Sequence, residues 1–384
     1  MSPSRAGTSG RWAWAEIDLD AISHNIGVVR RSVAPSEVWA VVKADGYGHG
    51  AAAVAGAALQ AGAEGLCVAL SEEGVELRRG GVDAPILVLS EQPPDQLAEV
   101  VDHRLISTVC SNGQIEGLAA AAAAAGLASH GHDGHQVHLK IDTGMHRAGC
   151  HPSDAVHLAA KIVASPALEL AGVFTHLAVA DDPAHPFTAL QLQRFDDVLA
   201  RLAASGIDAG LVHAANSAGA LAHPAARRSM VRIGIATYGI APGPGVAHLA
   251  RELWPALSLR ARVSFVRRLE AGERLSYGLR HTVDRATTIA TVPIGYADGV
   301  PRRLFTAGCP VLLGGRFHPI AGVVTMDQLM VDVGDSDVAF GDEVVLIGEQ
   351  GGKRITAEEW AVRLDTIGYE VVCGISKRIA RHLR

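Results

Sequence analysis

The chain has 384 residues, of which 48% are apolar and 19% are charged, and its formal net charge is -6. This length and apolar content predict a globular protein with two domains, or one barrel-sized domain with an appendage. The charge leaves no basic face for nucleic acid, and the apolar runs are too short to cross a bilayer, so neither nucleic acid nor a membrane is an expected partner.

The cysteines and the N-terminal residues indicate the compartment. The five cysteines lie far apart and never form a Cys-x-x-Cys pair, which argues against a disulfide framework or a zinc knuckle. Residues 1–10 are polar and lack the apolar segment of a secretory signal. We therefore expect reduced thiols and a cytoplasmic protein.

Eight short apolar runs organise the N-terminal part of the chain. Before them, residues 12–19 alternate apolar and polar side chains, which predicts a strand that could pair with a C-terminal sheet rather than with the barrel. The runs are rich in Val, Ile and Leu and lie at 38–42, 65–69, 86–89, 105–109, 137–141, 170–175, 211–214 and 230–235. Such runs are typical of strands buried on both faces, and the stretches between them, such as the alanine-rich 119–125, carry helix-forming residues. Eight strand-helix units over about 200 residues predict an α/β fold with an N-terminal (β/α)8, TIM-type barrel.

A segment rich in Pro and Gly at 241–245 predicts the end of the barrel, because it can continue neither a helix nor a central strand. We therefore expect domains at residues 11–243 and 244–384. Alternation over 257–266 predicts that the second domain is mainly β. Its other candidate strands lie at 286–294, 311–313, 318–324, 329–333 and 343–347. One helix is expected over 356–364, opened by a capping box of Thr356 and Glu359.

Lys43 stands out because it directly follows the first predicted barrel strand. Reactive groups in such barrels lie at the C-terminal ends of the strands. A lysine at the end of a buried strand is costly unless it is neutralised, paired or used covalently. Position alone leaves two interpretations open, a lysine that snorkels to the barrel rim and a functional lysine.

Longer motifs favour the functional interpretation. The segment AVVKADGYGHG, which contains Lys43, resembles the pyridoxal phosphate attachment motif of the alanine racemase family, whose members have fold type III. Further segments resemble the same family in the family's order, and together they span nearly the whole chain. They are VHLKIDTGMHRAG at 137–149, FTHLAVAD at 174–181, ANSAGA at 215–220, VRIGIATYG at 231–239, PIGYADG at 293–299, TMDQ at 325–328 and TIGYEVVC at 366–373.

The resemblance implies pyridoxal 5'-phosphate as the cofactor and assigns residues to it. Lys43 would hold the cofactor covalently, because an amine that attacks a carbonyl must be available in its neutral form. Arg232 would face the ring nitrogen, and since a guanidinium cannot accept a proton, that nitrogen would stay unprotonated. The other cofactor-binding residues that the resemblance implies are Tyr47, His176, Asn216, Ser217, Gly234, Ile235 and Tyr369.

The resemblance also implies the reaction, which is the interconversion of L-alanine and D-alanine through an external aldimine, supplying D-alanine for peptidoglycan. Inversion of the α-carbon needs an acid/base group on each face. Lys43 and Tyr296 match the two bases of the family, and His176 matches the residue hydrogen-bonded to the tyrosine. The implied substrate-binding residues are Tyr296, Arg147, Met326 and Asp327, and Lys140 matches a lysine that many family members carbamylate.

The position of Tyr296 implies an assembly. Tyr296 lies beyond the predicted barrel, and the family brings this tyrosine to the barrel mouth from the C-terminal domain of a neighbouring subunit. The expected partners are therefore alanine and a second copy of the chain, in a homodimer whose active sites are shared across the interface.

Three alternatives to alanine racemase remain, namely a racemase of broader specificity, a fold type III decarboxylase and a non-catalytic vitamin B6 carrier. Decarboxylases of this scaffold generally lack the arginine at the ring nitrogen, so Arg232 together with Tyr296 favours a racemase. A carrier would be a single barrel, in which the residues after Gly245 would have no purpose.

Three further features of the sequence need an interpretation. His130, His132, His135 and His138, with Asp133, have spacing compatible with Zn²⁺, but we interpret them as solvated histidines in a surface loop and expect no metal. Thr325 stands where many relatives have Cys or Ser, and His146 fills a variable position in the DTGMxR motif. Neither of these two departures removes a catalytic group.

Overall fold

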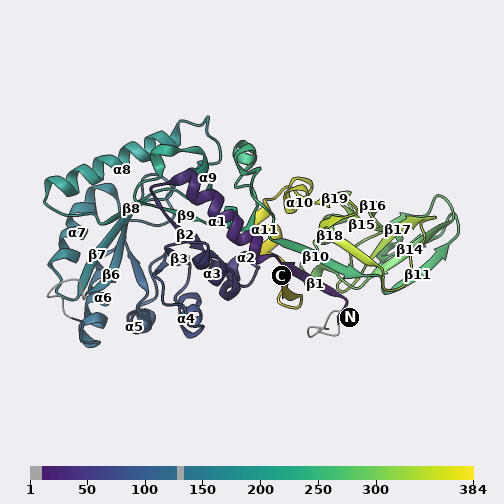
Figure 1. The fold of residues 1–384 in the computed structure, drawn as a ribbon, viewed down its shortest axis with the longest axis horizontal. Coiled ribbons are helices and arrows are strands. Elements are labelled where there is room, and N and C mark those ends of the chain that lie inside the picture. The colour runs from purple at the N-terminus through teal and green to yellow at the C-terminus, as the bar shows by residue number, and fades with distance from the viewer. Residues whose placement is uncertain (1–10, 128–133) are drawn as a thin grey trace. The chain divides into compact units, whose positions relative to one another are not determined.

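The computed structural model describes residues 11–127 and 134–384, and the chain divides into two compact units (Figure 1). The barrel unit is Asp20–Trp254, and the β unit joins the N-terminal segment up to Leu19 to Pro255–Arg384. The division therefore falls later than residue 243, where we expected it. The short helix η5 (Pro244–Ala250) packs against α9 (Ser217–Ala222), which keeps this segment with the barrel.

All eight predicted barrel strands are present, with ends within about two residues of those expected. They are β2 (Glu37–Val41), β3 (Gly65–Val68), β4 (Ile86–Val88), β5 (Ile106–Val109), β6 (His135–Lys140), β7 (Leu168–Phe174), β8 (Leu211–His213) and β9 (Met230–Ile233). They form a closed barrel in chain order, and β9 pairs back in parallel with β2. Most residues of these strands are buried because helices cover the outer faces, and this is why most of the strands read as apolar runs. Strand β6 is an exception, because it contains four polar residues.

Helices surround the barrel (Figure 1). They are α1 (Leu19–Val33), α3 (Ala51–Gln60), α4 (Ser71–Arg79), α5 (Leu97–Asp102), α6 (Asn112–Ala124), α7 (Ala155–Ala164) and α8 (Phe187–Ala204), and the short α2 (Lys43–Tyr47) and α9 follow the C-terminal ends of β2 and β8. The alanine-rich run belongs to α6, as predicted, and Ser111 caps this helix by accepting a hydrogen bond from the backbone N–H of Gln114.

The described residues of the β unit form three sheets. A seven-stranded sheet has the order β16-β15-β18-β10-β1-β20, with β19 paired to β18, and the smaller sheets are β11-β14-β17 and β12-β13. The strands are β1 (Ala13–Ile17), β10 (Leu257–Arg262), β11 (Phe265–Leu269), β12 (Arg274–Leu275), β13 (His281–Thr282), β14 (Thr287–Val292), β15 (Pro310–Leu313), β16 (Arg316–Pro319), β17 (Leu329–Gly334), β18 (Glu343–Gln350), β19 (Lys353–Ile355) and β20 (Ala380–Leu383).

In the seven-stranded sheet, strand β1 lies between β10 and β20, antiparallel to β10 and parallel to β20. Two strand predictions need correction. The alternation over 257–266 is divided between β10 and β11, which belong to different sheets, and the strand expected at 318–324 ends at Pro319. The capping box is present as predicted, since Glu359 N–H donates to Thr356 Oγ1 and Thr356 N–H donates to the Glu359 carboxylate, at the start of α10 (Ala357–Leu364).

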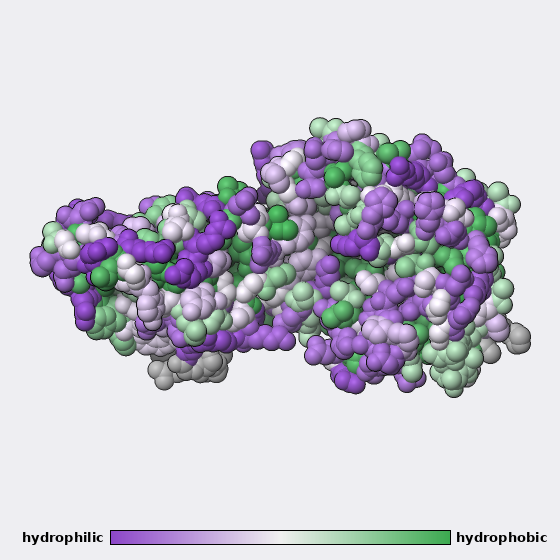
Figure 2. All heavy atoms as spheres, turned by 180° about the vertical axis from the view of Figure 1, so that it is seen from behind, coloured by the Kyte–Doolittle hydropathy of each residue, from purple (hydrophilic) through white to green (hydrophobic). Residues whose placement is uncertain are grey.

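The surface carries hydrophilic residues over much of the face shown in Figure 2, with hydrophobic residues in scattered areas. Within the described ranges, no helix has the length and apolar character needed to cross a membrane. All five cysteines lie in these ranges and all are free thiols.

Candidate active site

Lys43 lies two residues after the end of β2 and begins a turn of unusual backbone conformation. Ala44, Asp45, Gly46 and Tyr47 all have φ between 52° and 60°. Left-handed backbone costs roughly 1–2 kcal/mol for each residue that carries a Cβ, so the turn persists only because its surroundings hold it. Such strain is often found where a functional side chain must be presented, and it occurs here directly after Lys43.

Aromatic packing holds the C-terminal end of the turn, at Tyr47. The ring of Tyr47 lies 4.9 Å from that of Tyr238, which is fully buried. The Tyr238 hydroxyl donates to the carbonyl oxygen of Val41 at 2.9 Å, and Asp45 Oδ1 accepts the backbone N–H of Ala51 at 2.9 Å. The turn is thereby tied to the end of β2 and to the start of α3.

Arg232 lies inside the barrel and is 3% exposed. Its guanidinium donates to the carbonyl oxygens of Thr175 and Ala214, at 3.0 and 3.1 Å, and it lies over the ring of Phe174. Burial lowers the pKa of Arg232 to about 10, which still leaves it charged at neutral pH. Removing this cation from water is costly, and the fixed carbonyl oxygens offset that cost.

A chain of histidines extends from Arg232. Arg232 Nη1 lies 2.5 Å from His213 Nδ1, and His213 Nε2 lies 2.9 Å from His138 Nδ1. A guanidinium can only donate, so His213 Nδ1 must accept and the proton of His213 must be on Nε2. That N–H donates to His138 Nδ1, and His138 is therefore also protonated on Nε2. No motif assigned His213 a role, and only the barrel geometry reveals it.

The interpretation of the histidine-rich segment as solvated surface residues is wrong for two of its members. His135 and His138 are on β6 and are 4% and 0% exposed, and His135 Nε2 bonds to the Ser107 hydroxyl at 2.8 Å. Strand β6 begins at His135 rather than at residue 137, so both histidines lie in the barrel wall. His130, His132 and Asp133 lie outside the described residues. Among the residues that are described, no group of three or more His, Cys, Asp or Glu could hold a metal ion.

The neutral state of His138 predicts a dependence of stability on pH. Burial lowers the pKa of His138 to about 3 from an ordinary value of 6.5. Below pH 6.5 the unfolded chain binds a proton at this residue that the folded chain does not, so the free energy of unfolding falls by up to about 1.4 kcal/mol per pH unit until about pH 3. This contribution is absent above pH 6.5.

Urea unfolding between about pH 6 and pH 4 measures this slope. We expect the variant His138→Asn, whose Oδ1 can replace Nδ1 as acceptor, to show a slope smaller by about 1.4 kcal/mol per pH unit. His157→Asn, an exposed histidine on α7, is the control and should keep the slope of the unmodified chain. Equal slopes in all three proteins would show that His138 is already protonated in the folded state.

Four basic residues and one histidine lie close enough at this end of the barrel to affect one another. The pKa of His176 is held well below its ordinary value by burial and then by the charges of Arg232, Arg147, Lys140 and Lys43. The pKa of Lys140 is lowered to about 8, by burial and then by Arg147 and Arg232. Lys140 Nζ donates to the carbonyl oxygen of Leu89 at 3.1 Å. A mouth with this much positive charge suits an anionic ligand.

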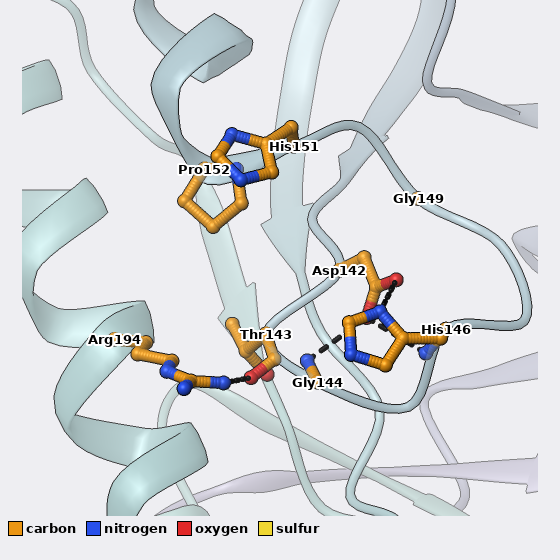
Figure 3. Close-up of a pocket in the computed structure, with 8 residues that line it drawn as sticks. All are labelled: Asp142, Thr143, Gly144, His146, Gly149, His151, Pro152 and Arg194. Carbon is orange, nitrogen blue, oxygen red and sulfur yellow. Dashed lines mark hydrogen bonds and ion pairs between the residues drawn. The ribbon is translucent and has the colours of Figure 1, made fainter.

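The loop that carries Arg147 is shaped by Asp142 (Figure 3). Asp142 Oδ1 accepts the backbone N–H groups of Gly144 and His146, at 2.9 and 3.1 Å, and Oδ2 lies 3.2 Å from His146 Nδ1. Arg194 donates to the carbonyl oxygen of Thr143 at 2.8 Å. These residues line a cavity of about 480 Å³, and none of its lining residues is a predicted ligand of cofactor or substrate. The cavity is therefore not the predicted site.

Four of the predicted cofactor-binding residues follow the ends of β8 and β9, namely Asn216, Ser217, Gly234 and Ile235. Ser217 Oγ accepts the backbone N–H of Gly234 at 3.0 Å, and Ile235 follows as a fully buried residue. Asn216 caps α9 by accepting the N–H of Gly219 at 2.9 Å. A Cβ at Gly234 would lie 2.5 Å from Tyr47 Oη, so glycine is required for the tyrosine to approach this backbone.

The remaining predicted site residues belong to the β unit. Tyr296 is 43% exposed, at the start of η7 (Tyr296–Asp298), and its N–H donates to the carbonyl oxygen of Thr325 at 3.0 Å. A Cβ at Gly295 would collide with this same backbone, so the glycine lets the PIGYADG and TMDQ motifs lie side by side. Met326 and Asp327 are more than half exposed, and Tyr369 lies on α11 (Gly368–Cys373). The two predicted bases are therefore in different units.

The turn that contains Tyr296 is fixed by a buried carboxylate two residues further along the chain. Asp298 is 0% exposed, and Arg11 donates to both of its oxygens, at 2.7 and 2.5 Å. Asp298 Oδ2 also accepts the N–H of Gly295 at 2.9 Å. A paired carboxylate that is hydrogen-bonded on both oxygens stabilises a buried turn, and here that turn presents the exposed Tyr296.

Comparison with known proteins identifies the family to which the chain belongs. Residues 17–242 match the family model of the alanine racemase N-terminal domain, and residues 256–383 match that of the C-terminal domain. The chain belongs to the alanine racemase family. An alanine racemase from Symbiobacterium thermophilum is 50% identical over 372 residues, covering 97% of each chain, and one from Thermobifida fusca is 42% identical, covering 96% of this chain and 97% of the relative. The crystal structure of alanine racemase from D-cycloserine-producing Streptomyces lavendulae superimposes with a TM-score of 0.91, at 37% identity and 98% coverage of both chains.

The alanine racemase family depends on pyridoxal 5'-phosphate, and the residues of the barrel unit fit this cofactor. Gly234, whose missing Cβ leaves room beside Tyr47, offers backbone that a phosphate can approach closely. Lys43 supplies an amine, and the fixed donors of Arg232 suit a ring nitrogen that accepts a hydrogen bond. The donor set and the charge of the mouth therefore match both ends of the cofactor.

Proposed function

We propose that this chain is an alanine racemase that interconverts L-alanine and D-alanine with pyridoxal 5'-phosphate, supplying D-alanine for peptidoglycan. The observation that carries the proposal is the placement of Lys43 and Arg232 in one barrel, in a chain whose two units match the two domains of this family from end to end. Arg232 favours this reading over a fold type III decarboxylase, because decarboxylases of this scaffold generally lack that arginine.

The cofactor, when bound, withdraws electrons from the α-carbon of the amino acid and so acidifies its proton. Arg232 can donate to an acceptor but cannot take up a proton, and the bonds that fix it inside the barrel keep this donor in place. It would therefore limit the electron withdrawal, which favours quick return of a proton to the α-carbon. Lys43 holds the cofactor and moves a proton at its Nζ on one face of the substrate.

Tyr296 serves the other face in this proposal. A phenol has a pKa near 10 and needs help to act as a base at neutral pH. His176 Nδ1 lies 3.2 Å from Arg232 Nη2, a donor, so Nδ1 accepts and the proton of His176 is on Nε2. That N–H can donate to the oxygen of Tyr296 and stabilise it after it has lost its proton.

The other assignments follow the charges and positions already described. Arg147 lies on an exposed loop among like charges, and a guanidinium there suits the substrate carboxylate. Exposed side chains of the β unit, Met326 and Asp327, would line the substrate pocket, and Tyr369 would reach the phosphate. In the barrel, Tyr47, Ser217, Gly234 and Ile235 would hold the phosphate, and Asn216 would be a further cofactor-binding residue.

We expect Lys140 to be carbamylated. An amine reacts with carbon dioxide only when neutral, and burial, with Arg147 next, lowers the pKa of Lys140 to about 8. The ammonium of Lys140 is repelled by the positive charges of Arg147 and Arg232. A carbamate at the same position would be an anion, which these charges attract, and it would hold Arg147 in position. Protein incubated with ¹³C-bicarbonate should give a protein-bound carbamate ¹³C resonance that is absent from Lys140→Ala and present in the exposed control Lys353→Ala. A resonance that survives in Lys140→Ala would place the modification elsewhere.

We further propose a cytoplasmic homodimer in which the β unit of each subunit completes the site of the other. Tyr296 and Met326 are exposed at 43% and 52%, and Tyr277, in the same unit, at 73%. Large apolar side chains exposed together are typical of an interface. The free cysteines agree with a reducing compartment.

Circular dichroism of L-alanine incubated with the purified holoenzyme tests the function. We expect ellipticity to fall to zero with no amine product, and the same end point from D-alanine. Production of ethylamine would identify a decarboxylase, and unchanged ellipticity would leave a carrier. Serine and other small amino acids in the same assay separate alanine racemase from a broader-specificity racemase.

A further inference from the structure

We propose that Glu73 is a positioning residue for Lys43, and that its carboxylate holds the left-handed turn from which Lys43 projects. The inference rests on the function proposed above, in which Lys43 moves a proton. Glu73 lies in the first turn of α4 and belongs to none of the motifs that indicated the site.

The two oxygens of Glu73 have separate partners. Oε2 accepts the backbone N–H groups of Ala69 and Leu70, at 2.8 and 3.1 Å, and these bonds form the cap of α4. Oε1 accepts the N–H of Ala44 at 2.6 Å. The second contact crosses from α4 to the turn after β2, and capping α4 does not require it.

This contact completes a clamp around Lys43. On its N-terminal side, the N–H of Val42 donates to the carbonyl oxygen of Cys67 on β3 at 2.9 Å. On its C-terminal side, Ala44 is held by Glu73. Both neighbours of Lys43 in the chain are thus fixed to the segment running from β3 into α4, so the direction of the Lys43 side chain is set by that segment.

The conformation of Ala44 explains why a charged acceptor is needed there. Ala44 has φ of 52° and ψ of 50°, which an alanine rarely adopts without support. Its N–H is the first donor of the turn, and a carboxylate makes shorter and stronger bonds to backbone N–H than a neutral acceptor does. The Tyr238 hydroxyl bonds to Val41, before Lys43, and Asp45 bonds to Ala51, so neither of these contacts satisfies the N–H of Ala44.

Glu73→Gln separates the two tasks of the carboxylate. A glutamine retains one acceptor oxygen, which satisfies the two N–H groups of the cap, and then its NH2 group faces the N–H of Ala44, donor against donor. Glu76→Gln is the matched control, because Glu76 is an exposed residue on the same helix and the change removes the same charge.

We expect Glu73→Gln to lower kcat by about 10-fold to 100-fold with little change in KM for alanine, since a displaced base slows proton transfer without removing a substrate contact. The α-deuterium isotope effect should rise for the enantiomer whose proton Lys43 removes and fall for the other. Hydrogen exchange in the peptide that contains Ala44 should accelerate. Glu76→Gln should match the unmodified enzyme in all three measurements.

A rescue variant distinguishes the loss of Lys43 positioning from a general loss of stability. Ala44→Gly removes the Cβ that makes the left-handed backbone costly, so adding it to Glu73→Gln should recover much of the lost kcat. A loss of kcat that the glycine does not recover, or equal isotope effects for the two enantiomers, would show a merely structural role and overturn the proposal. So would normal kcat in Glu73→Gln. If the unmodified enzyme itself does not racemise alanine, the proposed function has failed instead.

Discussion

Alanine in place of Lys43 will lower the rate of alanine racemisation by about 10³-fold or more. The change removes the amine that holds the cofactor and also the base for one face of the substrate, and a positioned base alone contributes roughly 10²-fold to 10⁴-fold. Racemisation from each enantiomer, followed by circular dichroism, measures the loss. The values of kcat/KM for the two directions must fall equally, because the two enantiomers have the same free energy.

The control for this change is Lys161→Ala. Lys161 is on α7 and pairs with Glu116 at 2.5 Å, and a surface pair of this kind contributes little. We expect unchanged racemisation in this variant. Borohydride reduction followed by peptide mass spectrometry adds an independent readout, since the unmodified chain should carry reduced cofactor on the peptide with Lys43. Normal turnover in Lys43→Ala would refute the assignment of Lys43.

Phenylalanine in place of Tyr296 will lower racemisation by about 10²-fold to 10⁴-fold, because it removes only the hydroxyl that serves the second face. Tyr296 is exposed and its backbone is held by Thr325, so the fold should tolerate the change. The protein should still bind the cofactor, since Lys43 is untouched. Racemisation and cofactor absorbance, measured on the same sample, separate these two effects.

Mixing the two inactive variants tests the shared site. If each site combines Lys43 of one subunit with Tyr296 of the other, a dimer of Lys43→Ala with Tyr296→Phe contains one intact site. Random reassortment of subunits would then restore activity to about one quarter of the unmodified level. If both residues act within one chain, every site in the mixture lacks one base and activity stays absent. The second outcome would exclude the proposed shared dimer site.

The barrel could be predicted because each of its strands carries its own signal. A strand covered by helices on one side and by the barrel interior on the other is apolar along its whole length, and eight such runs in succession admit few folds. The β unit gave a weaker signal. Short strands such as β12 and β13 have too few residues to establish a period, and β20 pairs with β1 from the opposite end of the chain.

The candidate site divides in the same way. Lys43 and Arg232 were found because they belong to family motifs, and Lys43 also stands out as a charge at the end of an apolar run. His213 and Glu73 gave no such signal, since one is a single histidine in a short strand and the other an ordinary glutamate in the first turn of a helix. Their roles arise from partners that are remote in the chain.

The sequence by itself determined the barrel strands and the family, and it supplied the proposed roles of Lys43 and Arg232, because these depend on residue type and local order. Only the tertiary structure decided that His138 is buried and neutral, that the barrel unit continues to Trp254, and that Glu73 reaches Ala44. Each of these depends on which backbone groups meet after the chain closes on itself, and hydrogen bonds between such groups leave no periodic pattern in the sequence.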